Sequence, residues 1–343
     1  MRARKLTVCV TKMDLSIVTT LYCSAPHMEE FYVRLCAAAE SVATNFEIIL
    51  VDDGSPDNSL QEALSLCRND KRIKVIELSR NFGHHKAIMT GLVHSCGDLV
   101  FLVDSDLEEE PELLEAFYLK LKETNAEVVF GVQEKRKGGL LERVGGALFY
   151  KIFNALSTHS IPRNLVTARL MTRKYVSALV EHREREMMMA GLWTLTGFQQ
   201  LPLPVRKLQR PGSTYTLRRR VGQMVNAITA FSSKPLEMIF YLGCTILFLS
   251  TIAALVIIIS KLLFGTLLLG WPSLIVSIWL LGGLTIFCLG VIGIYLSKIF
   301  IEVKQRPYTI VKDVYSYAAS PGDLTPVGEQ IERLEKDTVR QEV

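Results

Sequence analysis

The chain has 343 residues, 49% of them hydrophobic, and a formal net charge of +4. This length allows about two domains, and the hydrophobic excess is concentrated after Leu236. The charge is too small to indicate a nucleic-acid partner, and we expect none. Residues 1–13 are expected to be an N-terminal extension, because Met13 directly precedes the first strand-like run.

Short apolar runs alternate with helix-like stretches through the first part of the chain. Strands are expected at Leu15–Leu21, Phe46–Val51, Ile73–Leu78, Leu99–Val103 and Glu127–Gly131. Helices are expected at Met28–Ala43, at Ser59–Cys67 and over the stretch that ends at Gly91. Unbroken apolar runs of this length are typical of strands buried on both faces of a sheet. The alternation predicts βαβ units and an α/β fold with a mostly parallel sheet.

Carboxylates follow two of these strands. Asp52 and Asp53 end the second strand, and Asp104 and Asp106 follow the fourth. Ligands of parallel sheets bind beyond the carboxyl ends of the strands, and hard divalent cations prefer oxygen ligands. Either segment alone is equally typical of a solvated turn. Their occurrence on two strands of one sheet favours a binding site.

The C-terminal part is hydrophobic. Met238–Ile259 and Pro272–Ser297 are uncharged and long enough to cross a hydrocarbon core of ~30 Å at ~1.5 Å per residue. Basic residues flank the pair, so the positive-inside rule predicts a transmembrane hairpin with both chain ends in the cytoplasm. We therefore expect a catalytic domain at 14–216, a juxtamembrane helix at 217–235, two transmembrane helices at 236–300 and a cytoplasmic tail at 301–343.

Two stretches have the apolar spacing of amphipathic helices. Leu140–Leu156 and Leu217–Phe231 either lie in the membrane interface or pack on the catalytic domain. Gly283 and Gly290 share one face of the second span, which permits close helix packing and hence a homo-oligomer. The tail from Ser316 is polar, with at most one short helix at 329–339.

Several segments together resemble a known enzyme family. VDDGSPD, LSRNFGHHKAIMTG, VDSDLEEEPE and the two C-terminal spans occur in the order found in the family 2 inverting glycosyltransferases with a GT-A fold. More narrowly, they resemble the membrane-anchored polyprenyl-phosphate (dolichol-phosphate) sugar synthases of bacteria. The resemblance covers about Leu15 to Lys312. It implies a GT-A domain that uses a nucleoside-diphosphate sugar, with uridine the usual nucleoside.

The resemblance also implies roles for individual residues. Asp52 and Asp53 would hold the nucleoside, and Asp104 and Asp106 would reach the ribose, the diphosphate and a Mg²⁺ or Mn²⁺ ion. Glu108 stands where relatives often have glutamine, so Asp104, Asp106 and Glu108 form the expected metal site. The expected donor-binding residues are Asp52, Asp53, Ser55, Arg80, Asp104 and Ser105. His84 and His85 could contact the donor, although histidines at a helix start are more often structural.

One position departs from the family pattern. Relatives read I-P-x-N-x-x-D-x-R-L-M, and Thr167 stands at the acidic position while Arg169 matches the arginine. Asp106, Arg169 and Thr167 are the expected catalytic residues. Threonine cannot act as a carboxylate base, so either the chain is inactive or its acceptor needs no base. A phosphate monoester, with a second pKa near 6, is already nucleophilic at neutral pH.

A hydroxyl acceptor would need a base. Asp106, Glu184 and Glu186 are then the candidates, although the mixed charges around Glu184 favour an exposed helix face. Basic residues before the membrane spans suit either a lipid phosphate or anionic headgroups. The expected acceptor residues are Arg206, Arg210, Ser213 and Tyr215.

The sequence thus predicts a metal-dependent, inverting hexosyltransferase in the cytoplasmic membrane. It would move a hexose from a nucleotide sugar, UDP-linked in most relatives, to a polyprenyl phosphate such as undecaprenyl phosphate, on the cytoplasmic face. Two alternatives stay open: transfer to the hydroxyl of a lipid-linked glycan or glycolipid, and a catalytically silent membrane scaffold. A two-span channel is disfavoured, because neither span carries an ionisable residue.

Overall fold

The structure is a computed structural model that describes residues 13–133, 164–207, 229, 232, 234–264 and 270–317. The chain divides into two compact units. Unit 1 comprises Met1–Arg143, Ile161–Thr214 and Pro307–Val343, and unit 2 comprises Val144–Ser160 and Tyr215–Arg306. Most of the expected N-terminal extension, both expected amphipathic helices and the expected tail helix lie outside the described residues.

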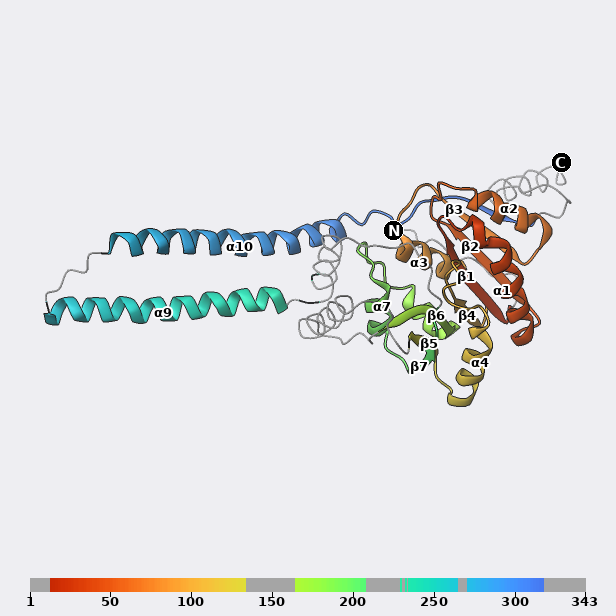
Figure 1. The fold of residues 1–343 in the computed structure, drawn as a ribbon, viewed down its shortest axis with the longest axis horizontal. Coiled ribbons are helices and arrows are strands. Elements are labelled where there is room, and N and C mark those ends of the chain that lie inside the picture. The colour runs from red at the N-terminus through yellow and green to blue at the C-terminus, as the bar shows by residue number, and fades with distance from the viewer. Residues whose placement is uncertain are drawn as a thin grey trace, which may run out of the picture. The chain divides into compact units, whose positions relative to one another are not determined.

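Unit 1 is built on an eight-stranded sheet with the order β7-β5-β6-β4-β1-β2-β3-β8 (Figure 1). The strands are β1 (Leu15–Leu21), β2 (Phe46–Asp52), β3 (Ile73–Leu78), β4 (Leu99–Leu102), β5 (Val128–Gln133), β6 (Leu165–Thr172), β7 (Gln200–Val205) and β8 (Val311–Ser316). The five strands expected from the sequence are confirmed, with ends that differ by two residues at most. The three later strands are additions that the apolar pattern did not predict.

The central strands β4, β1, β2 and β3 pair in parallel, and β5 pairs with β7 in parallel. The pairings β4–β6, β5–β6 and β3–β8 are antiparallel. The expected α/β fold with a mostly parallel sheet is therefore confirmed. Because β6 runs against β4, its first residues lie at the same edge as the carboxyl ends of β1 to β4. We call this side of the sheet the carboxyl edge.

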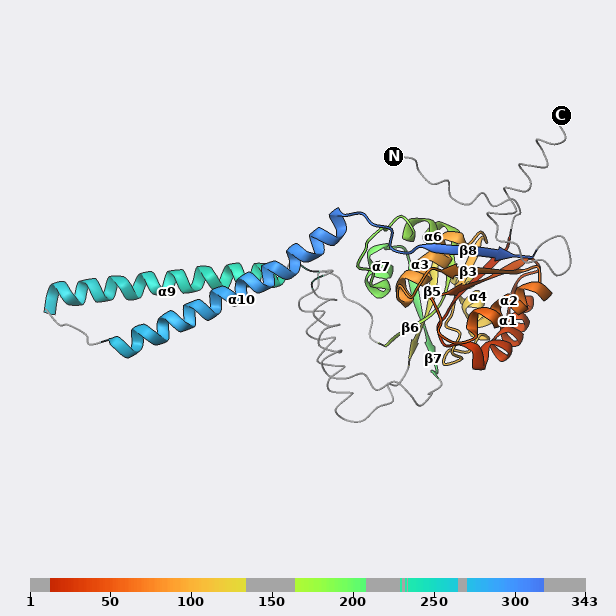
Figure 2. The ribbon, with the colours of Figure 1, turned by 90° about the horizontal axis from the view of Figure 1, so that it is seen from above.

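Helices cover both faces of the sheet (Figures 1 and 2). They are α1 (Met28–Val42), α2 (Ser59–Asn69), α3 (His84–His94), α4 (Leu113–Thr124), α6 (Arg173–Leu179) and α7 (Met189–Leu195), with a 3₁₀ turn at Ala25–His27. Side chains of α1, α2 and α4 form one core with alternate residues of the strands, such as Ile17, Ile48 and Phe101. Helix α3 packs on β1 and β2, where Gly91 leaves room for Val18 and Val51.

The last strand, β8, lies within residues 301–343, which were expected to form a cytoplasmic tail. It forms the edge of the sheet beside β3 and brings Lys312 Nζ within 2.6 Å of Glu77 Oε1. The Tyr315 hydroxyl donates to the other Glu77 oxygen at 2.9 Å. Glu77 is buried, so these two contacts compensate its carboxylate and fix the returning chain on unit 1.

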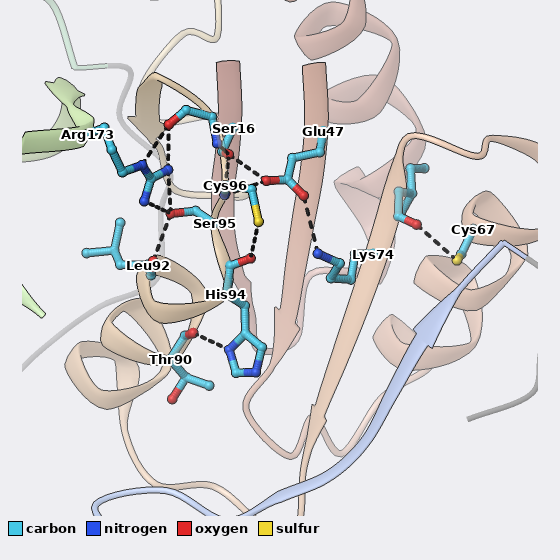
Figure 3. A network of polar contacts seen from close by, with 12 residues as sticks. Ser16, Glu47, Cys67, Lys74, Thr90, Leu92, His94, Ser95, Cys96 and Arg173 are labelled. Carbon is cyan, nitrogen blue, oxygen red and sulfur yellow. Dashed lines mark hydrogen bonds and ion pairs between the residues drawn. The ribbon is translucent and has the colours of Figure 1, made fainter. Parts of the chain in front are cut away.

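A polar network lies at the amino ends of β1 and β2, on the side of the sheet opposite the carboxyl edge (Figure 3). The buried Glu47 carboxylate accepts from Ser16 Oγ at 2.6 Å and from Cys96 N at 2.7 Å, and it pairs with Lys74. Arg173 donates to the Gly97 carbonyl at 2.6 Å. The network therefore ties the turn before β4 to the neighbouring strands, and its role is structural.

Unit 2 contains two long helices that contact each other, α9 (Lys234–Phe264) and α10 (Trp271–Val303). Within the part of the chain that the structure describes, one segment, Ser277–Val303, is long and apolar enough to cross a membrane. The expected span Met238–Ile259 falls within α9. Both helices expose large apolar side chains, such as Trp279 at 79% and Phe248 at 66%. Exposed apolar surface of this extent is typical of contact with lipid or another protein.

Candidate functional site

The acidic residues that follow β2 and β4 lie at the carboxyl edge. Asp52 ends β2 and Asp53 follows it, and Asp104 comes two residues after β4 ends. Strand β1 separates β2 from β4 in the sheet. The end of β1 contacts the turns after both strands, because the Leu21 carbonyl accepts from Asp53 N and the Thr20 carbonyl accepts from Ser105 Oγ. The sequence segments singled out above thus meet in one region of unit 1.

Asp53 is buried and bound on both oxygens by backbone. Its Oδ1 accepts from Phe82 N at 2.7 Å, and its Oδ2 accepts from Gly83 N at 3.0 Å. These N–H groups precede α3, so the carboxylate holds the loop that begins the helix. Burial raises the Asp53 pKa against the lowering effect of these two hydrogen bonds. Asp53 therefore fixes the loop that precedes α3.

Asp52 has one oxygen in use and one without a partner. Its Oδ2 accepts from Ser55 N at 3.3 Å, whereas Oδ1 is buried and has no hydrogen-bond partner among the described residues. Burial raises the Asp52 pKa above its ordinary value. An unpartnered buried acceptor is costly, and a ligand that brings an N–H or O–H group would satisfy it.

The turn after β2 packs closely on the loop that precedes α3. Gly54 has φ +64°, and a Cβ at this position would meet the backbone of Arg80 and Asn81. Glycine is therefore required for this approach. Arg80 itself is exposed, stacks 4.1 Å above the Phe82 ring and donates to the Asn81 carbonyl at 3.0 Å. Its guanidinium lies on the surface of the loop.

The two serines expected to bind the donor contact the end of β1. Ser105 Oγ donates to the Thr20 carbonyl at 2.9 Å and lies 2.8 Å from Ser24 Oγ. Ser55 Oγ donates to the Leu21 carbonyl at 3.2 Å. Ser105 is buried, so its hydroxyl fixes the turn after β4 on the neighbouring strand.

Asp104 is the carboxylate on which three segments converge. Its Oδ1 lies 3.5 Å from His84 Nε2. Burial raises the Asp104 pKa, the Thr167 side chain acts against this shift, and the neighbouring Asp106 charge acts with it. His84 Nδ1 lies 3.0 Å from Thr20 Oγ1, and burial lowers the His84 pKa. The imidazole therefore lies between β1 and the turn after β4 that carries Asp104.

The three expected metal ligands have different surroundings. Asp106 is exposed, and its Oδ1 accepts from Glu108 N at 2.9 Å. Glu108 Oε2 pairs with Lys207 Nζ at 2.8 Å. Within the described ranges no three acidic, histidine or cysteine side chains come close enough together to hold a metal ion. Asp104 and Asp106 carry carboxylate oxygens, the type of donor that hard divalent cations prefer, while Glu108 pairs with an ammonium group.

Sequence reasoning missed two residues of this region. Glu109 is buried, and its oxygens accept from Thr167 N at 3.0 Å and Ala168 N at 2.6 Å. Lys207 Nζ lies 3.7 Å from Glu109 Oε1 as well as beside Glu108. Burial and the nearby Asp104 charge raise the Glu109 pKa. Burial lowers the pKa of Lys207, but the contacts with Glu108 and Glu109 outweigh it and the net shift is upward.

Arg169 lies inside the protein. Its guanidinium stacks 2.9 Å from the centre of the Trp193 ring, and its Nε donates to the Thr167 carbonyl at 3.2 Å. The side chain is fully buried, and burial lowers its pKa to about 9. The arginine therefore fixes the start of β6, where Thr167 and Ala168 meet the acidic turn.

The expected acceptor residues are only partly described. Arg206 is exposed and directly follows β7, while Arg210, Ser213 and Tyr215 lie outside the described residues. Glu184 and Glu186 were expected on a charged helix face, and this is wrong: the segment is a loop between α6 and α7. His85 Nδ1 lies 3.2 Å from the Met187 carbonyl in the same loop, which supports a structural role for His85.

Comparison with known proteins gives consistent matches. A profile described as "Glycosyl transferase family 2" matches residues 16–180. A protein of Mycobacterium tuberculosis named "Putative glycosyltransferases" is 55% identical, over 88% of this chain and 89% of its own length. An "Uncharacterized glycosyltransferase YkcC" of Bacillus subtilis is 34% identical, over 88% and 94%. The "Bactoprenol glucosyl transferase" of Shigella phage SfII is 31% identical, over 88% and 98%.

Proposed function

The chain belongs to glycosyl transferase family 2, and we propose that it transfers a hexose from a nucleoside-diphosphate sugar to a polyprenyl phosphate at a membrane surface. One observation carries the proposal. The end of β1, the turns after β2 and β4, the start of α3 and the start of β6 are joined by hydrogen bonds at the carboxyl edge. Ligands of such sheets bind in this position.

Asp52 supports the donor side of this proposal. Its unpartnered Oδ1 is an acceptor suited to the imide N–H of a uracil ring, so we propose a UDP-linked sugar. Asp53 acts by holding the loop that carries Arg80, whose exposed guanidinium suits a phosphate or ribose oxygen. Ser55 and Ser105 act by fixing the surrounding turns rather than by donating from free hydroxyls.

Thr167 supports the acceptor side. Thr167, beside Asp104, carries a hydroxyl group rather than a carboxylate, so it cannot act as a base. A phosphate monoester is largely dianionic at neutral pH and attacks without a base, whereas a sugar hydroxyl requires one. The bactoprenol glucosyl transferases among the relatives support a polyprenyl phosphate as the acceptor. We propose Arg206, Arg210, Ser213 and Tyr215 as residues that meet this phosphate.

A divalent cation fits the donor chemistry of Asp104 and Asp106. We propose that these two carboxylates hold Mg²⁺ or Mn²⁺, which supplies positive charge opposite the diphosphate leaving group. Glu108 would join them only after its contact with Lys207 is released. Asp106 is the more exposed of the pair and is the residue we propose next to the reacting atoms.

Membrane attachment completes the proposal. We propose that α9 and α10 form a transmembrane hairpin with the catalytic unit and both chain ends in the cytoplasm, as the flanking basic residues indicate. The apolar segment Ser277–Val303 supports one of the two spans. A homo-oligomer formed through Gly283 and Gly290 stays a prediction.

The test is an assay on the full-length protein in membranes. Labelled UDP-, GDP- and TDP-hexoses are supplied with undecaprenyl phosphate, with and without a chelator. The proposal predicts a labelled lipid from a UDP-hexose that disappears with chelator and in Asp106→Asn. Absence of any transferred label, with every donor, would favour a silent scaffold. Label appearing in lipid-linked glycan but not in polyprenyl phosphate would favour the hydroxyl acceptor.

A further inference from the structure

We propose that Lys207 binds the donor diphosphate, and that Glu108 and Glu109 hold its ammonium group in place until the donor arrives. The inference rests on the proposed function and adds to that site one residue and a resting state. Lys207 lies at the same edge of the sheet as the acidic residues. Strand β7 ends at the buried Val205 on the carboxyl edge, and Lys207 follows two residues later.

The contacts of Lys207 place its ammonium group among the site carboxylates. Nζ lies 2.8 Å from Glu108 Oε2 and 3.7 Å from Glu109 Oε1. It also interacts electrostatically with Asp104 and His84. The side chain keeps 31% of its surface exposed, compared with 1% for Glu109, so solvent and ligands can reach it.

The charge of this region explains why a cation is needed. Asp104, Asp106, Glu108 and Glu109 bring four carboxyl groups to one turn, and a diphosphate would be repelled there. Among the lysine and arginine side chains that the structure describes, Lys207 forms an ion pair with Glu108 and Glu109 of this turn. A lysine ammonium is a compact charge with three donors on a flexible stem, which allows it to exchange one anionic partner for another.

Glu108 and Glu109 differ in how freely their carboxylates can move away from Lys207. Glu109 is fixed by the N–H groups of Thr167 and Ala168, so it cannot follow the lysine. Glu108 is partly exposed, and its carboxylate is bound to Lys207 alone in the contacts that the structure describes. Transfer of the ammonium to a diphosphate would free Glu108 toward a cation held by Asp104 and Asp106. Glu108 therefore acts as a resting counter-ion, and Lys207 as the group that the donor recruits.

The test measures binding of UDP and UMP to the full-length protein in detergent, in the presence of a chelator. These two nucleotides differ by one phosphate. We expect Lys207→Met to weaken UDP binding at least tenfold and to leave UMP binding unchanged, while Lys207→Arg retains most of the UDP affinity. Equal weakening of both nucleotides would mean a structural role and would overturn the inference, as would unchanged UDP binding in Lys207→Met.

Glu108→Gln tests the resting pair. With chelator present, the substitution is expected to tighten UDP binding about threefold or more, and this gain should vanish in the Lys207→Met background. A gain that persists without the lysine would show general charge relief, and weaker binding in Glu108→Gln would show a structural contact; either overturns the resting state. The binding measurements are repeated with Mg²⁺ added; if the wild-type protein binds neither nucleotide under either condition, the proposed uridine donor fails first, and the inference falls with it.

Discussion

Asp53 accepts the backbone N–H of Phe82 at 2.7 Å, although the two residues are separated by a helix and a strand in the chain. The same carboxylate accepts from Gly83, whose φ of +100° turns the chain into α3. An aspartate that follows β2 thus sets the position of a loop that follows β3. In a site for nucleotide sugars, this makes Asp53 a positioning residue for the loop around Arg80.

Replacement of Asp53 by asparagine should loosen this loop. The amide keeps one acceptor and turns an NH₂ group toward the second N–H, so one bond to a charged acceptor is lost, a change of about 1.5–3 kcal/mol. We expect hydrogen exchange at Phe82 and Gly83 to accelerate at least tenfold, with a raised donor KM. Asp57→Asn is the control, because Asp57 bonds to Ser59 and Ala25 instead. Unchanged exchange at both amides would contradict this role.

Asp104 should be needed for catalysis and not for folding. The substitution Asp104→Asn removes the charge proposed to hold the cation, so we expect kcat to fall roughly 100-fold or more. The thermal midpoint should stay the same or rise, because burial opposes the charged form of this carboxyl. Glu62→Gln on the exposed face of α2 is the matched control. Activity within twofold of wild type in Asp104→Asn would remove Asp104 from the mechanism.

Thr167 should keep a second negative charge away from Asp104. Thr167→Asp adds such a charge and should lower the rate of transfer to undecaprenyl phosphate at least tenfold. Thr167→Asn, which is uncharged and of similar size, is the control and should be affected less. An unchanged or increased rate in Thr167→Asp would contradict this role.

Acid should destabilise unit 1 through His94 of α3. Burial lowers the pKa of this half-buried histidine below its ordinary value. The neutral form then favours the folded state, so this stability is present above the ordinary pKa and is lost as the pH falls through the lowered pKa of the folded state. The loss is at most ~1.4 kcal/mol per pH unit.

His94 allows a direct test of this pH dependence, because it lies away from the carboxyl edge, with its Nδ1 2.8 Å from the Thr90 carbonyl (Figure 3). The charges of Lys74 and Glu47 also act on its pKa, in opposite directions. Thermal midpoints are compared at about pH 7.5 and about pH 5.5 for wild type and His94→Gln. We expect the midpoint of the wild type to fall further on acidification than that of the variant. Parallel curves for the two proteins would show that His94 does not contribute.

The first five strands could be predicted because each is a short run rich in apolar and β-branched residues. The later strands could not, for reasons visible in their residues. Strand β6 carries Arg169 at its centre, and the charge is tolerated because it stacks on Trp193 inside the protein. Strand β7 contains Pro202 and Pro204, which an edge position allows. Strand β8 follows two long apolar helices and is held by Glu77 from far back in the chain.

The candidate site was predictable where acids end buried strands, as Asp52, Asp53, Asp104 and Asp106 do. Partners that come from elsewhere were not. In the sequence, Glu109 is one more acid in a cluster that is typical of an exposed turn. In the structure it is buried, because β6 supplies two N–H groups to its carboxylate. In the sequence, Lys207 is one of several basic residues before the membrane spans. The pairing of β7 with β5 brings it to Glu108. Such contacts depend on strand order, which spacing in the sequence does not encode.

The most direct test of the account compares two acceptors with the purified full-length protein and one labelled UDP-hexose. Undecaprenyl phosphate and undecaprenol differ only in the phosphate that the proposed reaction attacks with. The account predicts a labelled lipid from undecaprenyl phosphate alone, with the label released by mild acid as expected for a glycosyl phosphate. Label on undecaprenol, or an acid-stable product, would contradict it.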